Sequence, residues 1–349
     1  MRQGYPLAGG RPAPEGKKCS EPTVESGAGT PGSMRAMKKV LITAGASGIG
    51  REMVRAFSKD GARVAVIDID QAALSALQVE LAAAITEVCD LADLAQLEAS
   101  VNRCLAALGG VDVLINNAGI AGPTAPVERI HPEDWERVMR VNLGAMFNVT
   151  RLSIPHLRKS SSGCIINMSS AAGRMGYPNR SPYAASKWGV IGLTKTLAME
   201  LGEDGIRANA LLPGAVAGPR MERVLEGRAA ASGRTLEQER VSALANQSLK
   251  SFTEAHEIAA MALFLASDAA KTITGQAICI DGGLNRSVEG WVVSGGENRE
   301  NCLDVFCVTP DGGAQRRLVA IQFARNCRHL CSPIAYRRMR NPGPRRDDA

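Results

Sequence analysis

The sequence predicts an α/β fold in which helices cover both faces of a parallel sheet. From residue 38 to residue 284, short apolar segments alternate with longer segments whose apolar residues recur at helical spacing. The apolar segments number seven, and strands that are buried on both faces have this continuous apolar character. Because strand and helix alternate along the chain, we predict a single domain built on a doubly wound parallel sheet.

The alternation gives expected bounds for each element. The strands are expected at the short apolar runs, in chain order Lys39–Thr43, Arg63–Ile67, Ile85–Cys89, Val111–Ile115, Cys164–Met168, Ala208–Leu212 and Ala277–Ile280. The helices are expected between them, at Gly48–Asp60, Gln71–Ala83, Leu94–Leu108, Pro132–Leu157, Ser181–Leu201 and Glu254–Ala266.

Composition separates this core, residues 37–284, from two terminal extensions. Residues 1–36 are rich in Gly, Pro, Ser and charge without any periodicity, so we predict a disordered extension. Residues 285–349 form an atypical basic segment rich in Cys and Arg, with one apolar run at residues 318–323. We predict a poorly ordered tail there, the alternative being a small extension that contacts a partner or another subunit.

The net charge of +6 belongs to these extensions. Residues 1–36 hold five basic and three acidic residues, residues 285–349 hold eleven and seven, and the core holds 25 of each. A neutral core with 4% aromatic residues has no basic groove with stacking platforms, so no nucleic acid is expected as a partner. With no apolar run of membrane-spanning length and no secretory signal, we expect a cytoplasmic protein that has no membrane partner.

The cysteine pattern predicts free thiols and no metal site. Nine cysteines are present, and those of the core stand singly in apolar runs, at Cys89, Cys104, Cys164 and Cys279. This usage fits a reducing compartment. A second group lies in the tail, where its loose spacing argues against zinc, at Cys302, Cys307, Cys327, His329 and Cys331.

A glycine-rich turn follows the first strand and opens the first helix. It reads Thr43-Ala44-Gly45-Ala46-Ser47-Gly48-Ile49-Gly50. Glycines at such a turn let a pyrophosphate approach the backbone at the positive end of the helix, as in Rossmann-type domains. The residues expected to bind the cofactor here are Gly45, Ser47, Gly48, Ile49 and Gly50. The alternative is glycine used for backbone reasons only.

Polar residues after the next strands extend this candidate site. Asp68 ends the second strand, where a carboxylate accepts ribose hydroxyls and repels a 2′-phosphate, which favours NAD over NADP. Asp90 and Leu91 follow the third strand and are candidates for the adenine edge. For both aspartates the alternative is helix capping, a role that Asp70 could also fill. After the fourth strand, Asn117, Ala118 and Gly119 would let the cofactor lie against backbone, unless they form a plain turn.

Tyr183 and Lys187 are the candidate proton-transfer pair. Four residues apart in a predicted helix, they share one face. A free phenol titrates near pH ~10, and a neighbouring ammonium favours its ionised form. Ser170, at the end of the fifth strand, could hydrogen-bond the substrate oxygen, with Ser169 as the alternative. Asn142 lies inside the predicted helix 132–157, where an amide ordinarily faces solvent or a neighbouring side chain.

Together these residues resemble the short-chain dehydrogenase/reductase family over residues 37–284. The resemblance lies in the ordered set of motifs: the turn at 43–50, Asn116-Asn117-Ala118-Gly119, Asn142, Ser170, Tyr183-x-x-x-Lys187, Pro213-Gly214 and Asp281-Gly282-Gly283. It implies a catalytic tetrad of Asn142, Ser170, Tyr183 and Lys187. In this tetrad Asn142 holds a water molecule that belongs to a proton relay through Lys187 and the cofactor ribose. Tyr183 and Lys187 are also implied to contact the cofactor.

The resemblance has further implications for the site and the assembly. It implies that Pro213, Gly214 and Val216 border the nicotinamide, and that the chain forms a homotetramer or homodimer. One departure is Ala44, which stands where the family has its first motif glycine; we expect Gly45 to absorb the strain of the turn. The segment 215–250 is expected to form a substrate lid, as in relatives.

The implied function is hydride transfer between NAD(H) and a small-molecule secondary alcohol or ketone. Within the family the core resembles members labelled 3-oxoacyl-(acyl-carrier-protein) reductase, so an NADPH-dependent reductase of that kind is the alternative. The non-enzyme alternatives are an NADH-binding module and a scaffold that acts through the tail. Arg174, Arg180 and Arg220 raise the hypothesis of an anionic or polyhydroxy substrate, against the alternative of solvated surface arginines.

Overall fold

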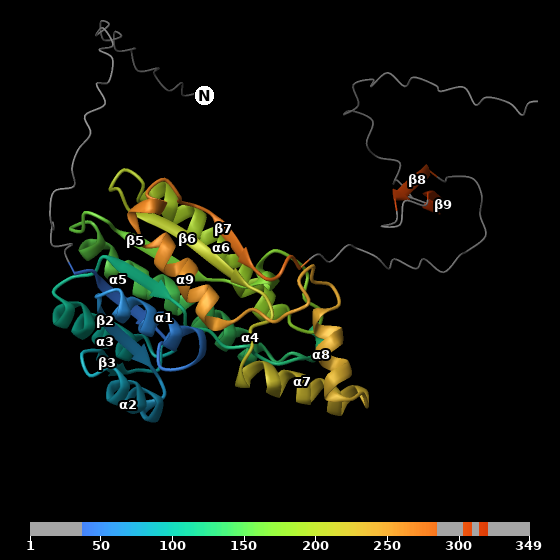
Figure 1. Cartoon of the computed structure of the whole chain (residues 1–349), viewed down its shortest axis with the longest axis horizontal. Coiled ribbons are helices and arrows are strands. Elements are labelled where there is room, and N and C mark those ends of the chain that lie inside the picture. Colours follow the sequence, from blue (N-terminus) through green and yellow to red (C-terminus); the bar gives the residue numbers. More distant parts are fainter. Residues whose placement is uncertain (1–36, 285–302, 309–313, 320–349) are drawn as a thin grey trace, which may run out of the picture. The chain divides into compact units, whose positions relative to one another are not determined.

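Seven parallel strands form the central layer of the computed structural model, which describes residues 37–284, 303–308 and 314–319 (Figure 1). Their order across the sheet is β3-β2-β1-β4-β5-β6-β7. The strands are β1 (Lys39–Thr43), β2 (Arg63–Asp68), β3 (Ile85–Val88), β4 (Val113–Asn116), β5 (Cys164–Met168), β6 (Arg207–Pro213) and β7 (Ala277–Ile280). The predicted doubly wound parallel sheet is therefore confirmed.

Helices cover both faces of this sheet. They are α1 (Gly48–Lys59), α2 (Gln71–Glu80), α3 (Leu94–Leu108), α4 (Pro132–Met139), α5 (Ala145–Leu157), α6 (Ser181–Glu200), α7 (Pro219–Ser232), α8 (Leu236–Leu244) and α9 (Ala255–Leu265). Buried side chains of α1, α2 and α9 form one core layer, and those of α3, α5 and α6 form the other.

The pleat of the strands divides their side chains between these two layers. On β1, Val40 and Ile42 pack into the layer of α1 and α9, whereas Leu41 between them packs into the layer of α3 and α5. Successive residues of a strand point to opposite faces, so a strand in the middle of a three-layer fold needs apolar residues throughout. This requirement explains the continuous apolar runs that the sequence shows.

The strand order reverses between β1 and β4, and this reversal positions the candidate site. β1 is followed by a helix that leads to β2 on one side, while β4 and the strands after it lie on the other. In open parallel sheets, ligands bind outside the carboxyl ends of the strands at such a reversal. The glycine-rich turn after β1 and the segment after β4 meet there.

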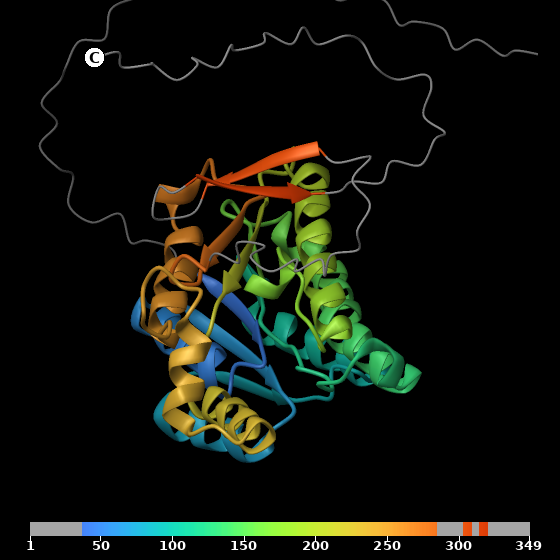
Figure 2. The same ribbon diagram turned by 90° about the vertical axis from the view of Figure 1, so that its right-hand side faces the viewer.

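The helix expected at Gln71–Ala83 ends at Glu80, and the helix expected over 132–157 is not continuous. The single helix expected over 132–157 is interrupted by a π-helical turn, η2 (Arg140–Gly144), between α4 and α5. The segment 215–250 contains α7 and α8, which follow the carboxyl end of β6 (Figure 2). A helix that changes its hydrogen-bond register in the middle depends on what packs against it, which periodicity alone does not reveal.

The second unit of the chain contains two paired strands. β8 (Leu303–Val308) and β9 (Ala314–Val319) are antiparallel. The predictions for residues 1–36 and for the rest of 285–349, including Cys302, Cys327, His329 and Cys331, fall outside the described residues. Among the helices that the structure describes, none has the length and apolar character needed to cross a membrane.

Candidate functional site

The turn between β1 and α1 is tight, and its strain falls on Ala44. Ala44 has a φ of 52°, in the left-handed region that an L residue adopts at a cost. The expectation that Gly45 would absorb this strain is wrong. Gly45 is required for another reason, since a β-carbon there would lie 2.7 Å from Cγ1 of Val66. At Gly50 a β-carbon would lie 2.1 Å from the carbonyl oxygen of Ala44.

The end of β4 holds this turn in place. The hydroxyl oxygen of Thr43 accepts the backbone N–H groups of Asn117, at 3.0 Å, and Ala118, at 3.1 Å. The amide of Asn117 donates to the carbonyl oxygen of Ala44 at 2.8 Å. Sequence reasoning did not select Thr43 as a site residue, although its place at the end of β1 next to the glycines was a signal.

The amino end of α1 fits a phosphate group. Ser47 precedes the helix with an extended backbone, and its hydroxyl makes no capping bond. Gly48 has a φ of 53° with no atom within 4 Å of the position of a β-carbon, so space is open in front of the turn. The N–H groups of Gly48, Ile49 and Gly50 lie in the first turn of α1, where the helix dipole favours an anion.

Asp68 lies beside the glycine-rich turn and does not cap a helix. Its carboxylate accepts the N–H of Ala46 at 2.9 Å and that of Asp70 at 3.1 Å. The cap of α2 is Asp70 itself, which accepts the N–H of Ala73 at 2.9 Å. Each carboxylate oxygen of Asp68 can accept a further hydrogen bond, as ribose hydroxyls would require.

Asp90 makes a hydrogen bond within the turn that follows β3. Its carboxylate accepts the N–H of Ala92 at 2.9 Å, while Asp93 caps α3. Asp90 is exposed at the carboxyl end of β3, and Leu91 next to it packs partly against the second core layer. One oxygen of Asp90 stays available at the position expected for an adenine edge.

Lys187, Asn142 and Gly119 meet at the carboxyl ends of β4 and β5. A β-carbon on Gly119 would lie 3.2 Å from Nζ of Lys187 and 3.3 Å from Oδ1 of Asn142. Lys187 is buried, and Nζ donates to the carbonyl oxygen of Met168 at 2.8 Å. The same ammonium lies 5.7 Å from the centre of the Tyr183 ring. The structure thus brings residues from four separate segments together.

Burial, with a smaller contribution from the positive charge of Arg220, lowers the pKa of Lys187 to about 8. Desolvation penalises the charged ammonium, while the Met168 carbonyl offers only a neutral acceptor. The charged form of Lys187 therefore still predominates at neutral pH, and keeping this charge buried lowers the free energy of unfolding.

Asn142 is held on both sides within the π-helical turn. Its Oδ1 accepts the N–H of Ile120 at 2.7 Å, and its Nδ2 donates to the carbonyl oxygen of Ile120 and to Oγ of Ser186, each at 3.0 Å. Ser186 in turn donates to the carbonyl oxygen of Tyr183 at 2.8 Å. Sequence reasoning missed Ser186, whose place directly before Lys187 was the available signal.

The two serines after β5 have different environments. Ser169 is buried, and its hydroxyl donates to the carbonyl oxygen of Lys187 at 2.8 Å. Ser170 is partly exposed, and its oxygen accepts the N–H of Ala172 at 3.2 Å, which leaves its hydroxyl proton available. Ser170 is therefore the better placed of the two to bind a substrate oxygen.

The residues after β6 pack on the segment after β7. Gly214 donates to the carbonyl oxygen of Ile280 at 2.9 Å, and a β-carbon there would lie 2.7 Å from Cα of Asp281. Pro213 is the last residue of β6, and Val216 pairs with Thr253. These contacts fix the backbone at the base of α7 and α8.

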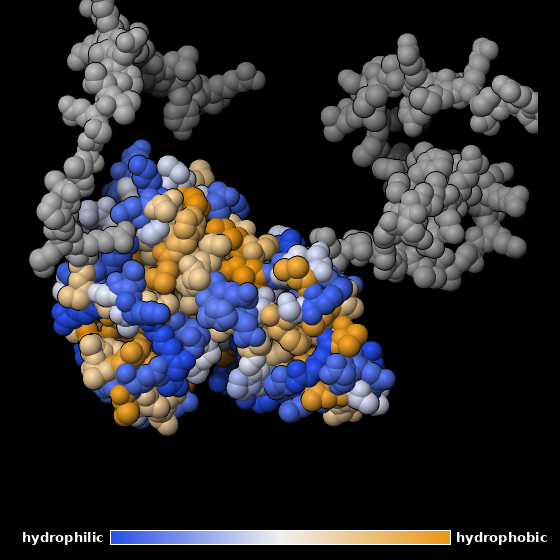
Figure 3. Space-filling model, in the orientation of Figure 1, coloured by the Kyte–Doolittle hydropathy of each residue, from blue (hydrophilic) through white to orange (hydrophobic). Residues whose placement is uncertain are grey.

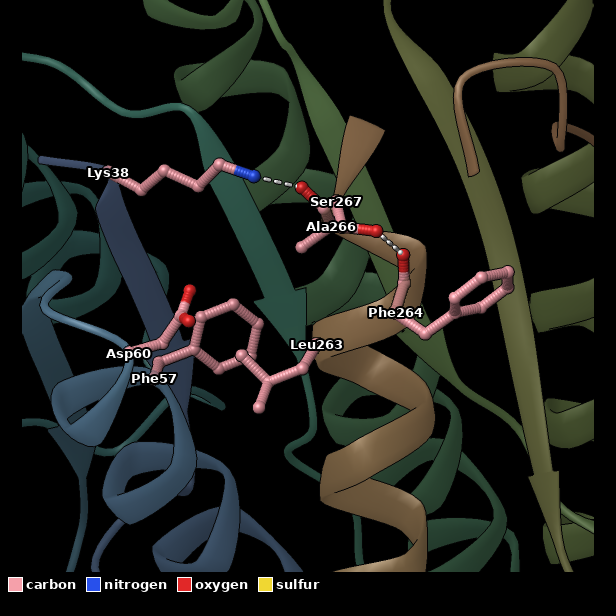
Figure 4. Close-up of a pocket in the computed structure, with 7 residues that line it drawn as sticks. All are labelled: Lys38, Phe57, Asp60, Leu263, Phe264, Ala266 and Ser267. Atoms are coloured by element: carbon pink, nitrogen blue, oxygen red, sulfur yellow. Dashed lines mark hydrogen bonds between the residues drawn. The ribbon is translucent and has the colours of Figure 1, made fainter. Parts of the chain in front are cut away.

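The space-filling view shows an indentation between the lobe of α7 and α8 and the remainder of the sheet domain (Figure 3). A separate pocket lies at the opposite end of the sheet and is lined by Lys38, Phe57, Asp60, Leu263, Phe264, Ala266 and Ser267 (Figure 4). There the ammonium of Lys38 donates to the carbonyl oxygen of Ala266. None of the predicted site residues lines this pocket.

Comparison with known proteins places the core among oxidoreductases. Residues 43–285 match the family model described as enoyl-(acyl carrier protein) reductase. The 3-oxoacyl-(acyl-carrier-protein) reductase of Thermotoga maritima is 40% identical over 251 residues, which cover 71% of this chain and 97% of that protein.

Solved structures with the same fold hold either nicotinamide cofactor. A variant of actinorhodin polyketide ketoreductase with NADPH has a TM-score of 0.68 and 32% identity, covering 72% of this chain and 98% of that one. An NAD⁺-bound xylitol dehydrogenase has a TM-score of 0.67 and 28% identity, covering 70% and 98%.

Proposed function

This chain belongs to the short-chain dehydrogenase/reductase family, and we propose that it interconverts a secondary alcohol and a ketone with Tyr183 as general acid and base. It is an NAD(P)-dependent oxidoreductase that acts on CH–OH groups. When bound, the nicotinamide supplies or accepts the hydride. The single observation that carries the assignment of the site is the convergence of Lys187, Asn142 and the Tyr183 ring beside the glycine-rich turn.

Each member of the tetrad has a separate part in proton transfer. In alcohol oxidation Oη of Tyr183 accepts the hydroxyl proton, and in ketone reduction it returns a proton to the carbonyl oxygen. The ammonium of Lys187 holds a positive charge 5.7 Å from the centre of the Tyr183 ring and would bind the cofactor ribose. Ser170 donates to the substrate oxygen. Both N–H groups of the Asn142 side-chain amide donate to protein acceptors, Ile120 and Ser186. Its Oδ1 accepts one N–H and keeps a second lone pair, which can bind the water of the proton relay.

Replacement of the phenol tests this proposal. We expect Tyr183→Phe to lower turnover of every alcohol substrate by roughly 100-fold or more, the scale of general acid–base catalysis. NADH binding, measured by fluorescence titration, should stay within about threefold of the wild-type value, because the ring is retained. Undiminished turnover in Tyr183→Phe would contradict the mechanism.

For the cofactor, we favour NAD(H), because Asp68 presents a carboxylate beside the glycine-rich turn, where a 2′-phosphate would meet like charge. The residues proposed to hold it are those at the carboxyl strand ends: Gly45, Ser47, Gly48, Ile49, Gly50, Asp68, Asp90, Leu91, Asn117, Ala118, Gly119, Tyr183, Lys187, Pro213, Gly214 and Val216. The crowded glycine positions and the open amino end of α1 support this fit.

An NADPH-dependent 3-oxoacyl-(acyl-carrier-protein) reductase is the second candidate, favoured by the 40% identity to the Thermotoga maritima protein of that name. Turnover with NADH and NADPH on an acyl-carrier-protein substrate and on a panel of small secondary alcohols separates the two. A preference for NADPH together with the carrier-bound substrate would favour this candidate over the first.

A homodimer or homotetramer in the cytoplasm completes the proposal. The aromatic side chains of Phe147 on α5 and Trp188 on α6 are 51% and 52% exposed. Gly192 lies in the middle of α6 with open space beyond its Cα, where glycine costs helix stability without an internal packing reason. A second subunit against this surface would account for both features. The free core thiols Cys89, Cys104 and Cys164 support a reducing compartment.

A further inference from the structure

Positive charge surrounds the Tyr183 ring. The guanidinium carbon of Arg180 lies 5.5 Å from the centre of that ring and 5.7 Å from the Tyr177 ring. Nζ of Lys187 lies 5.7 Å from the Tyr183 ring. Two cations therefore lie next to the side chain proposed to exchange a proton with the substrate.

Among the described residues, only neutral groups hydrogen-bond the guanidinium of Arg180. One terminal nitrogen donates to Oγ1 of Thr124 at 3.0 Å and the other to the carbonyl oxygen of Ala121 at 3.3 Å. Its Nε is buried without a hydrogen-bond partner, and no carboxylate in the described ranges forms an ion pair with it. Because neutral acceptors do not cancel the charge, Arg180 presents a cation beside the loop that follows β4.

A second arginine approaches from α7. Arg220 lies in the first turn of this helix, is exposed, and has no ion pair or hydrogen bond within the described part of the chain. Its charge nonetheless acts on the buried ammonium of Lys187. α7 follows the carboxyl end of β6, and the segment with Arg180 follows the carboxyl end of the neighbouring strand β5, so both arginines belong to the same edge of the sheet.

Nearby arginines with structural roles are neutralised. Arg174 pairs with Asp281 at 2.7 Å, and Arg240 pairs with Glu222. This contrast separates Arg174 from the other two arginines near the site. It also argues against Arg180 as an ordinary solvated surface residue, since its guanidinium contacts two aromatic rings and its Nε is enclosed.

We propose that the substrate of this enzyme carries a carboxylate, which Arg180 binds and Arg220 contacts as the second cation. A planar carboxylate matches the N–H fork of a guanidinium and would supply the negative charge that the described part of the chain does not provide. The substrate class is then a hydroxy acid or its oxo acid. This inference rests on the proposed function, because it takes Tyr183 as the reacting centre.

Matched substrates test the proposal by turnover. A panel of 2-, 3- and 4-hydroxy acids is compared with the corresponding primary amides, which keep shape and lose charge. We expect the best acid to exceed its amide at least 10-fold in kcat/KM. Arg180→Met should lower the value for the acid by about 10- to 100-fold and for the amide by less than threefold, with partial recovery in Arg180→Lys.

Arg220→Met should lower the value for the acid by a smaller factor, because this side chain is exposed. Arg223→Met is its matched control, an exposed arginine one turn further along α7, and should leave the acid-to-amide ratio unchanged. Equal losses for acid and amide in Arg180→Met would overturn the proposal, and the amide rate reports whether that variant keeps an intact site.

A binding measurement keeps this inference separate from the proposed function. Malonate has no oxidisable alcohol, and malonamide is its neutral counterpart. We expect calorimetry on the full chain to detect malonate binding that weakens at least 10-fold in Arg180→Met, with no comparable binding of malonamide. Absence of turnover with intact, Arg180-dependent malonate binding would refute the proposed function alone. Malonate affinity equal in wild type and Arg180→Met would refute the carboxylate site alone.

Discussion

Lys187 illustrates how a single buried charge links the reaction to stability. Its ammonium is enclosed next to Met168 and close to Asn142, and burial together with Arg220 lowers its pKa to about 8 from 10.5. The unfolded chain binds this proton up to about pH 10.5, so between these pH values the unfolded state holds more protons than the folded one. The free energy of unfolding contributed by Lys187 therefore rises with pH across this window.

We expect Lys187→Met to inactivate the enzyme and to stabilise it at pH 7. The pKa difference corresponds to at most about 3 kcal/mol, part of which is offset because the Met168 carbonyl loses its donor. Urea unfolding at pH 7, 9 and 10 measures the effect, and the advantage of the variant should shrink as the pH rises. Lys195→Met, on the exposed side of α6, is the control. A pH-independent difference between Lys187→Met and wild type would contradict this account.

Replacement of Asp68 tests which cofactor the enzyme prefers. We expect Asp68→Asn to lower kcat/KM for NAD by roughly 10-fold or more, because a charge-assisted hydrogen bond to the ribose is weakened. Activity with NADP should rise as the like charge disappears. Asp70→Asn removes an equal charge two residues away while keeping a good cap for α2, so it should leave the NAD-to-NADP ratio unchanged. Identical shifts in both variants would show that net charge, not position, sets the preference.

At the scale of elements, the β1–α1 turn combines strain with function. We expect Ala44→Gly to stabilise the protein by up to about 1 kcal/mol. Relief of the left-handed φ is worth roughly 1–2 kcal/mol, against roughly 0.4–1 kcal/mol for the added freedom of the unfolded chain. Thermal unfolding measures this change, and NADH titration of the same samples shows whether the methyl group affects cofactor binding.

Ala46→Gly is the matched control for this turn. Ala46 is fully buried and has no left-handed φ. Its replacement therefore removes packing and adds chain entropy without relieving strain, and the melting temperature should fall. A fall of equal size in Ala44→Gly would show that the turn is unstrained.

The π-helical turn shows why the bounds of elements were less predictable than their existence. The strands were predicted to within two residues, because buried strands need apolar residues at every position. Periodicity extended one helix through 132–157, whereas the structure interrupts it at 140–144. Asn142 turns inward there to bond Ile120 and Ser186, which lie far from it in sequence. Helical periodicity contains no information about such partners.

At the scale of the whole molecule, the exposed aromatic side chains of α5 and α6 should govern assembly. We expect light scattering to show a dimer or tetramer for the wild type, and a smaller species for Phe147→Glu, because a buried, unpaired charge at the interface is unfavourable. Val79→Glu places the same charge on α2, against the other face of the sheet, at a side chain that is 88% exposed. Val79→Glu should leave the size of the assembly unchanged. A monomeric wild-type protein would contradict the expected dimer or tetramer.

The sequence by itself determined the layered fold and the identity of the candidate residues. Alternating apolar segments specify a doubly wound sheet because each strand must be buried on two sides, and the spacing of Tyr183 and Lys187 places both on one helical face. Only the tertiary structure decided how these residues are used. It put the strain of the β1–α1 turn on Ala44 and engaged the hydroxyl of Ser169 with a backbone carbonyl. It paired Arg174 with Asp281, and within the described ranges it gave Arg180 no ion pair. These outcomes depend on contacts between distant segments, and such contacts are fixed by packing rather than by local pattern.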